Sequence, residues 1–133
     1  MSWAPWELSS LAFNIEDQGH PADYVGVSIK KLCNRSYSYE FTQHALIDSI
    51  IEDAGISDSK TKPVPAKVSL WLHAFKNEQV FDLDFNYRSV VGKLNYLAQT
   101  TRPDIMYATH QIAKYSSDPR QSHGKAILYL IHY

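Results

Sequence analysis

The segment "YLAQTTRPDIMYA", residues 96–108, restricts the possible fold more than any other part of the sequence. Helical periodicity continues on both sides of it, but the letters TTRP at 100–103 interrupt the pattern. Proline lacks a backbone N–H and suits the first turn of a helix, where that group would have no partner. Asp104, which follows, is favoured at the positive end of the helix dipole. The segment therefore predicts a sharp corner where one helix ends and another begins.

The helix before the corner is predicted to start near Asn86, with Asp84 or Asn86 as its capping residue. Its apolar face consists of Tyr87, Val90, Val91, Leu94, Leu97 and Ala98. Gly92 costs this helix about 1 kcal/mol relative to alanine, and it is better tolerated where another backbone approaches closely. The helix after the corner is predicted to bury Ile105, Ala108, Ile112 and Tyr115.

Two further amphipathic helices are predicted. Residues 43–56 have apolar side chains at helical spacing, with Thr42 as the N-cap and Gly55 as a left-handed C-terminal stop. The letters SSDP end the helix after the corner, and a last helix starts near Ser122. Its apolar positions are Ala126, Ile127, Leu130 and Ile131. Because the periodicity continues to Tyr133 without a cap, we expect a truncated C-terminus.

The first part of the chain has the alternating pattern of β-strands. The letters "DYVGVSIKK" at 23–31 predict one strand with Val25, Val27 and Ile29 on one face. The letters "YSYEFT" at 37–42 alternate again, and the polar NRS between the two runs favours an antiparallel hairpin. The expected fold class is therefore α+β, with an N-terminal antiparallel β-hairpin followed by a mainly α-helical bundle of about four helices.

Five regions are expected along the chain. They are an unassigned lead-in at 1–12, a hairpin at 13–42, a helix at 43–56, a proline-containing linker and irregular segment at 57–85, and a helical region at 86–133. In the fourth region, the letters "VSLWLHAF" fit either a buried strand or a short helix.

Charge is unevenly distributed, although the formal net charge is only -1. Up to Phe85 there are seven Lys/Arg against twelve Asp/Glu, and from Asn86 onward there are six against two. A basic C-terminal part suits contact with a polyanion, although short helical domains also acquire such a bias by chance. At the corner, Arg102 and the adjacent helix N-terminus together would form a site for an anion. The alternative interpretation is that Arg102 only solvates the turn.

The sequence has few features of an independent enzyme. It has no HExxH, GxSxG or glycine-rich phosphate loop, and its single cysteine, Cys33, excludes an internal disulfide. Asp82 and Asp84 form a D-x-D spacing whose two carboxylates could hold a divalent ion. The alternative is that one of them caps the next helix and the other faces solvent. The N-terminus has no signal-peptide pattern, and no apolar run approaches about 20 residues. We expect a soluble intracellular protein, cytoplasmic or nuclear, with no membrane partner.

Residues 87–108 carry the letters "YRSVVGKLNYLAQTTRPDIMYA". This segment closely resembles the pattern Y-R-x-x-V-G-x-L-x-Y-L-x-x-x-T-R-P-D-I-x-Y-A of copia-type (Ty-copia) retrotransposon reverse transcriptases. His123, Ala126, Tyr129 and Leu130 match a later part of that pattern, and the strand at 23–31 and the segment from 41 to 66 resemble earlier parts. The resemblance covers about residues 13–133 and places the chain after the catalytic palm motif and before RNase H.

The resemblance implies a role in holding a template–primer duplex. The primer grip, a glycine-containing strand that holds the primer end, falls on Tyr24, Val25 and Gly26. The helical part is similar to the thumb and connection region, which follows the duplex through its phosphates and minor groove. Basic candidates for that surface are Arg88, Lys93, Arg102, Lys114, Arg120 and Lys125, and Arg102 ranks first among them.

The sequence also departs from the family. The polymerase requires a Tyr-x-Asp-Asp turn whose aspartates hold Mg²⁺, and this chain has no Asp-Asp pair. The metal-binding carboxylates of RNase H are also missing, residues 1–10 match nothing in the family, and Gly124 stands where an aromatic residue is common. We therefore expect no catalytic residue, cofactor or metal in this chain, with Mg²⁺ needed only by the full-length enzyme.

Three interpretations follow. In the first, the chain is a piece of an RNA-directed DNA polymerase that binds an RNA–DNA or DNA duplex and contacts the palm and RNase H parts of its polyprotein. In the second, it is a small helical module that packs on a protein partner. In the third, it is a relic of a transposable element that does not fold stably, because its hairpin lacks the palm sheet.

Overall fold

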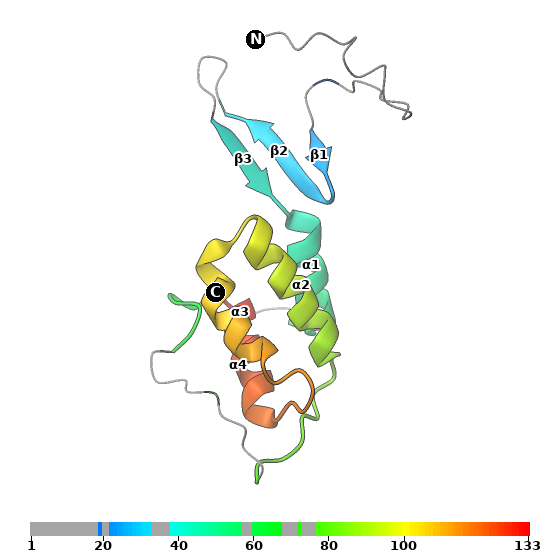
Figure 1. Ribbon diagram of the computed structural model, residues 1–133, viewed down its shortest axis with the longest axis vertical. Helices are drawn as coiled ribbons and strands as arrows, with labels where there is room; N and C mark the ends of the chain where they lie inside the picture. The colour runs from blue at the N-terminus through cyan, green and yellow to red at the C-terminus, as the bar shows by residue number, and fades with distance from the viewer. Residues whose placement is uncertain (1–18, 20–21, 33–37, 57–59, 68–71, 73–76) are drawn as a thin grey trace, which may run out of the picture.

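The computed structural model describes residues 19, 22–32, 38–56, 60–67, 72 and 77–133, and it has an α+β fold (Figure 1). A three-stranded antiparallel sheet contains β1 (Asp23–Tyr24), β2 (Val27–Lys31) and β3 (Tyr39–Thr42) in that order. The helices that follow are α1 (His44–Asp53), α2 (Tyr87–Thr100), the short 3₁₀ helix η2 (Pro103–Ile105), α3 (Met106–Ala113) and α4 (Gln121–Ile131). The expected fold class is confirmed.

Helix α2 forms the centre of the helical part. Asn86 caps it, because the Asn86 side chain accepts a hydrogen bond from Ser89 N at 3.0 Å. All six residues of the predicted apolar face are buried: Tyr87, Val90, Val91, Leu94, Leu97 and Ala98. They pack with Ile50 of α1, Ile105 and Ile112 beyond the corner, and Ile127 and Leu130 of α4. The core is therefore the surface that α2 shares with its neighbours.

Helix α1 ends as its sequence predicts. Gly55 has a φ of +66° in the left-handed region, Gly55 N donates to Glu52 O, and Ile56 N donates to Ile51 O. These two bonds form a Schellman motif, which satisfies carbonyls that the last turn would otherwise leave unpaired. At the other end of α1 the prediction is wrong by one residue. Thr42 belongs to β3, and Gln43 occupies the N-cap position without a capping side-chain bond.

The predicted corner is present. Helix α2 ends at Thr100, Pro103 opens η2, and α3 continues from Met106. Ile105, Ala108 and Ile112 are buried as predicted, whereas Tyr115 is half-buried and stacks on the fully buried His123 with ring centroids 4.1 Å apart. A hydrogen bond of 2.9 Å from the Tyr87 hydroxyl to Ile112 O joins α2 to α3.

The single strand predicted at 23–31 is wrong. Val25 and Gly26 form a two-residue turn between β1 and β2, and Tyr24 pairs with Val27 across it. Both turn residues have positive φ, +50° for Val25 and +75° for Gly26, which is the requirement of a type I′ hairpin turn. Alternating side chains alone did not predict this, because a valine in the left-handed region is rare. The predicted pairing of β2 with β3 is confirmed.

Residues 60–67 and 77–85, from the expected linker, contain no helix or named strand, and both segments contact α4. Lys62 N donates to His132 O at 2.7 Å near the end of the helix. At its start, Glu78 accepts hydrogen bonds from Ser122 N at 3.1 Å and from Ser122 Oγ at 2.6 Å. A carboxylate is favoured there because the first N–H groups of a helix lack partners. Residues 1–12 and most of "VSLWLHAF" lie outside the described residues.

Two glycines inside helices have opposite surroundings. A Cβ placed on Gly92 would meet nothing within 4 Å, so no other backbone among the described residues approaches closely there. A Cβ placed on Gly124 would lie 2.6 Å from Phe81 Cε2 and 2.9 Å from Leu83 Cδ1. Gly124 is therefore needed for the packing of residues 81–83 against α4, and an aromatic residue would not fit.

This contrast predicts opposite effects of the same substitution. We expect Gly92→Ala to raise the free energy of unfolding by about 1 kcal/mol, because alanine loses less backbone entropy in a helix. Gly124→Ala should lower it by about 1–3 kcal/mol, because the new methyl group overpacks the core. Urea denaturation of both variants tests this, and a stabilising Gly124→Ala would contradict the packing described.

Candidate nucleic-acid interface

The turn between β1 and β2 brings the three primer-grip candidates to an exposed position. Tyr24 is 68% exposed and Val25 67%, and a Cβ on Gly26 would meet nothing within 4 Å. The backbone of this turn is therefore accessible to another chain. A β-branched residue is strained at positive φ by about 1–2 kcal/mol, so other contacts must hold Val25 in this conformation.

Tyr96 provides such a contact from α2. Its hydroxyl donates a hydrogen bond of 2.7 Å to Val25 O, and 71 residues separate the two in the sequence. Figure 1 shows the sheet beyond one end of the helices, with β3 leading directly into α1. The bond from Tyr96 is thus a second attachment of the sheet to the helical part, and it acts on the turn itself.

A polar cluster joins the corner to the junction of sheet and helices. Gln43 is only 2% exposed, and its Oε1 accepts hydrogen bonds from the hydroxyls of Thr100 and Thr101, the latter at 2.9 Å. Gln43 Nε2 is buried and has no partner among the described residues. Turning the amide would let Nε2 donate to the threonine hydroxyls, but Oε1 would then be buried without a partner. This junction therefore carries a polar cost in either orientation.

Arg102 lies at the corner, and its guanidinium is engaged there. It bonds to Asp104 through Nε and Nη2, with the closest contact at 2.9 Å, and its Cζ lies 5.2 Å from the centre of the Tyr133 ring. The hydrogen bond from Arg102 lowers the pKa of the Asp104 carboxyl, and the same bond raises the pKa of the arginine. Arg102 therefore connects the corner to the end of α4, which is more than solvation of a turn.

Two other basic candidates are also paired with carboxylates. Lys93 Nζ lies 2.8 Å from Asp53 Oδ2 and 2.5 Å from Ser49 Oγ, so it connects α2 to α1. Arg120 Nη2 lies 2.7 Å from Asp118 Oδ2, and its Nη1 donates to Glu78 O at 3.1 Å. With Arg102, these side chains hold parts of the chain together and have their charge locally compensated.

The other three basic candidates are exposed and have no carboxylate partner among the described residues. Arg88 Nε donates to Ser116 O at 2.8 Å, Lys114 donates to Gln111 Oε1 at 3.0 Å, and Lys125 lies on the exposed side of α4. The bond from Arg88 places the start of α2 beside the loop after α3. Because α2 has 14 residues, this place is about 20 Å from the corner. The six basic residues therefore do not form one continuous patch.

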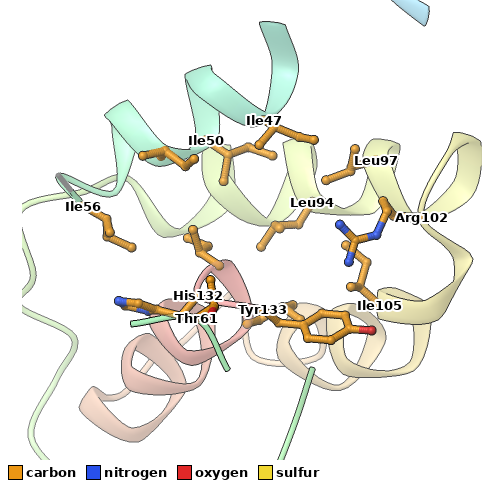
Figure 2. A pocket seen from close by; sticks show the side chains of 13 residues that line it. Ile47, Ile50, Ile56, Thr61, Leu94, Leu97, Arg102, Ile105, His132 and Tyr133 are labelled. Carbon is orange, nitrogen blue, oxygen red and sulfur yellow. The ribbon is translucent and has the colours of Figure 1, made fainter. Parts of the chain in front are cut away.

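A pocket of about 410 Å³ lies between α1, α2 and the end of α4. Figure 2 shows Ile47 and Ile50 of α1 facing Leu94 and Leu97 of α2, with Arg102 at one end. Its lining is otherwise mainly apolar and includes Ile51, Ile56, Ile105, Leu130 and Ile131.

The described residues contain no group of three or more His, Cys, Asp or Glu side chains that could hold a metal ion, and Asp82 and Asp84 are exposed. No described helix is long and apolar enough to span a membrane.

Three contacts in this region were not predicted from the sequence. Gln43 is a polar residue at the start of a predicted helix and Glu78 lies in a segment without periodicity, and their partners are 44 or more positions away along the chain. Tyr96 resembles any exposed aromatic residue on a helix. Its bond to Val25 O can be recognised only once the turn is located, and the sequence pattern predicted a strand where that turn lies.

The bond from Tyr96 yields a prediction about motion. Tyr96→Phe removes the hydroxyl and should leave the helices unchanged, while ¹⁵N order parameters of the turn and β2 fall because one attachment is lost. Tyr107→Phe is the matched control, because Tyr107 is 73% exposed on α3. Equal order parameters in the wild type and Tyr96→Phe would show that the bond does not hold the sheet.

The pair at the corner yields a prediction about pH. Because the pKa of Asp104 is lower in the folded chain than its ordinary value of 3.8, the pair stabilises the fold above pH 3.8 and this contribution is lost as the pH falls through the folded pKa. Asp104→Asn should therefore cost at most about 1 kcal/mol at pH 7, since both side chains are partly exposed. The difference should shrink as the pH falls below 3.8, and a difference that grows there would contradict the sign.

No protein-family model and no solved structure matches the chain. Curated proteins do match it. The Retrovirus-related Pol polyprotein from transposon RE1 of Arabidopsis thaliana is 25% identical over 124 residues, which are 93% of this chain and 8% of the polyprotein. An uncharacterized mitochondrial protein of the same plant is 30% identical over 116 residues, covering 86% of this chain and 45% of that protein.

A putative transposon Ty5-1 protein of Saccharomyces cerevisiae is 24% identical over 127 residues, covering 96% of this chain and 40% of that protein. The chain thus spans less than half the length of each of these relatives. The matches extend through both the sheet and the helices, because each covers 86% or more of the chain. The chain is therefore homologous to a segment of retrotransposon Pol polyproteins, and the matches support its origin in such a polyprotein.

Proposed function

We propose that this chain is the template–primer-binding part of a retrotransposon reverse transcriptase, located after the palm motif and before RNase H. The observation that carries the proposal is the exposed turn at Val25 and Gly26, in a chain homologous to Pol polyprotein segments. A glycine with open space above it lets a nucleic-acid backbone approach a protein backbone closely. Tyr96 fixes the turn relative to α2, so that the turn can hold the strand in a defined position.

Electrostatics supports a secondary contact at the far end of the helical part. Arg88 and Lys114 lie beside the loop after α3, and neither is neutralised by a carboxylate among the described residues. Such side chains gain free energy from phosphates by releasing condensed counterions, and this gain weakens with salt. Arg102, Lys93 and Arg120 would contribute less, because binding a phosphate would require them to leave Asp104, Asp53 and Asp118.

The proposed role is binding rather than nucleotidyl transfer. Two-metal phosphoryl chemistry requires closely spaced carboxylates, and the sequence has no Asp-Asp pair to supply them. In the proposed enzyme, the palm and RNase H parts of the polyprotein would supply the chemistry with Mg²⁺. The turn and the helices would then hold the duplex in place for it.

The apolar pocket favours a second candidate function, that of a helical module which packs on a protein partner. Its lining contains nine isoleucine and leucine side chains: Ile47, Ile50, Ile51, Ile56, Leu94, Leu97, Ile105, Leu130 and Ile131. An apolar pocket of this kind suits an apolar side chain from the apolar face of a partner helix. A chain that binds such a helix and no nucleic acid would favour this alternative.

Binding of an RNA–DNA hybrid tests the proposal. We expect the affinity to fall roughly a thousandfold between 50 and 200 mM salt if about six phosphates are contacted. Gly26→Asn should weaken binding, because asparagine tolerates positive φ but its side chain fills the space above the turn. Fluorescence anisotropy with a labelled hybrid measures both effects.

Gly55→Asn is the matched control. Gly55 also has positive φ and open space around it, but it lies at the end of α1 rather than on the hairpin turn. We expect its affinity for the hybrid to equal that of the wild type. Equal weakening by both variants would remove the turn from the interface, and a wild-type chain that binds no hybrid at 50 mM salt would contradict the proposed function.

A further inference from the structure

The segment that follows α1 brings two lysines to one aromatic ring of α4. Lys62 Nζ lies 5.7 Å from the centre of the Tyr129 ring, and Lys67 Nζ lies 5.5 Å from it. Lys125 is one helical turn before Tyr129, so these two side chains are neighbours on the surface of α4. We call Lys62, Lys67 and Lys125 the lysine cluster.

No carboxylate among the described residues forms an ion pair with the lysine cluster. Asp104 lines a pocket together with Lys67, but its carboxylate is bound to Arg102. Lys67 and Lys125 are exposed, and Lys62 is half-buried. The positive charges of the cluster are therefore accessible to a ligand.

The stability of the fold accounts for only one of the two lysines at the ring. Lys62 N donates to His132 O at 2.7 Å, which holds this lysine at the C-terminal end of α4, where the helix dipole favours a cation. Its ammonium group is also attracted to the ring of Tyr129. The same ring brings Lys67 to within about 11 Å of the first ammonium group, and like charges repel. An anion bound by both would relieve that repulsion.

The backbone holds the two lysines at this spacing before any ligand binds. Pro63 and Pro65 lie between them, restrict φ and favour an extended conformation. Ala66 packs against the core, and the bond from Lys62 N fixes the other end of the segment. Binding therefore requires little ordering of the chain, which favours affinity.

The spacing and the position of the cluster fit a duplex backbone. Along one strand a phosphate recurs about every 3.4 Å of helix axis, so a span of about 11 Å holds about three phosphates. The end of α4 lies beside the corner, because Arg102 Cζ is 5.2 Å from the centre of the Tyr133 ring. Tyr96, which bonds to the hairpin turn, is near the same end of α2. One duplex can therefore contact both the turn and the cluster.

We propose that the lysine cluster binds consecutive phosphates of one strand of the template–primer duplex. This inference rests on the proposed function, and it gives a role to Lys62 and Lys67, which the sequence pattern did not indicate. The turn contacts the primer end, whereas the cluster contacts the duplex behind it.

The salt dependence of hybrid binding tests the inference. Each phosphate contact adds about 0.9 to the slope of log affinity against log salt concentration, so Lys62→Gln/Lys67→Gln should make the slope shallower by about 1.8. The affinity of the wild type should then fall roughly tenfold further than that of the variant between about 50 and 200 mM salt. Fluorescence anisotropy with a labelled RNA–DNA hybrid measures both slopes.

Two matched variants control for net charge and for the contact with the ring. Lys30→Gln/Lys31→Gln removes the same charge from β2, and Lys62→Arg/Lys67→Arg keeps both charge and attraction to the ring. We expect the wild-type slope for both. Equal loss of slope in the two glutamine variants, or a wild-type slope in Lys62→Gln/Lys67→Gln, would overturn the inference.

Lysine acetylation of the wild type, followed by mass spectrometry, tests the contact without any substitution. The hybrid should protect Lys62 and Lys67 and leave Lys30 and Lys31 as reactive as in the free chain. Absence of this protection, while the hybrid is bound, would contradict the inference. So would a labelled oligoglutamate that binds as tightly through the same lysines, since an acidic protein segment would then be the partner.

Gly26→Asn separates this inference from the proposed role of the turn. If Gly26→Asn weakens binding and the lysine variants keep the wild-type slope, the inference fails and the proposed function stands. If the slope depends on Lys62 and Lys67 and binding is insensitive to Gly26→Asn, the cluster is supported and the turn is removed from the interface. A chain that binds no hybrid contradicts both.

Discussion

The buried face of α2 is the constraint on which the rest of the structure depends. Its residues, from Tyr87 to Ala98, share one core cluster with residues of α1, α3 and α4. Burial of apolar area is the main source of stability, and here one helix supplies the largest continuous part of it. The corner after Thr100 exists because this face must be covered by α3 and α4, which requires the chain to reverse direction at once. Pro103 and the polar bonds of the corner define where the reversal occurs.

The sheet depends on α2 in a different way. It shares no large apolar surface with the described helices, and it is attached where β3 continues into α1 and where Tyr96 bonds to Val25. Gln43, at the first of these attachments, is buried with an incompletely satisfied amide. The sheet should therefore open at a lower free energy than the helices, as is common for parts of proteins that bind ligands. This arrangement is consistent with a hairpin that is positioned by the helices and stabilised further by what it binds.

The sequence predicted the helices much better than the sheet and the site. Helical periodicity and end signals are local properties, so the face of α2, the left-handed stop of α1 at Gly55 and the corner at Pro103 were all predicted correctly. The turn at Val25 was missed because its conformation is unfavourable for valine and is held by Tyr96, a contact across 71 residues. The sequence also did not predict which basic residues are paired with carboxylates. Whether Arg102 or Arg88 keeps its charge available depends on nearby carboxylates, and these partners are set by tertiary structure.

Homology to Pol polyprotein segments and an exposed, tethered hairpin turn together favour a chain that holds nucleic acid and leaves chemistry to other parts of a polyprotein. All of this requires that the isolated chain folds around α2. Native-state hydrogen exchange at increasing denaturant tests that requirement most directly. Amides of Val90, Leu94 and Leu97 should exchange only by global unfolding, and those of β2 should exchange at a lower free energy. Absence of protection in α2, or a sheet more stable than the helices, would contradict it.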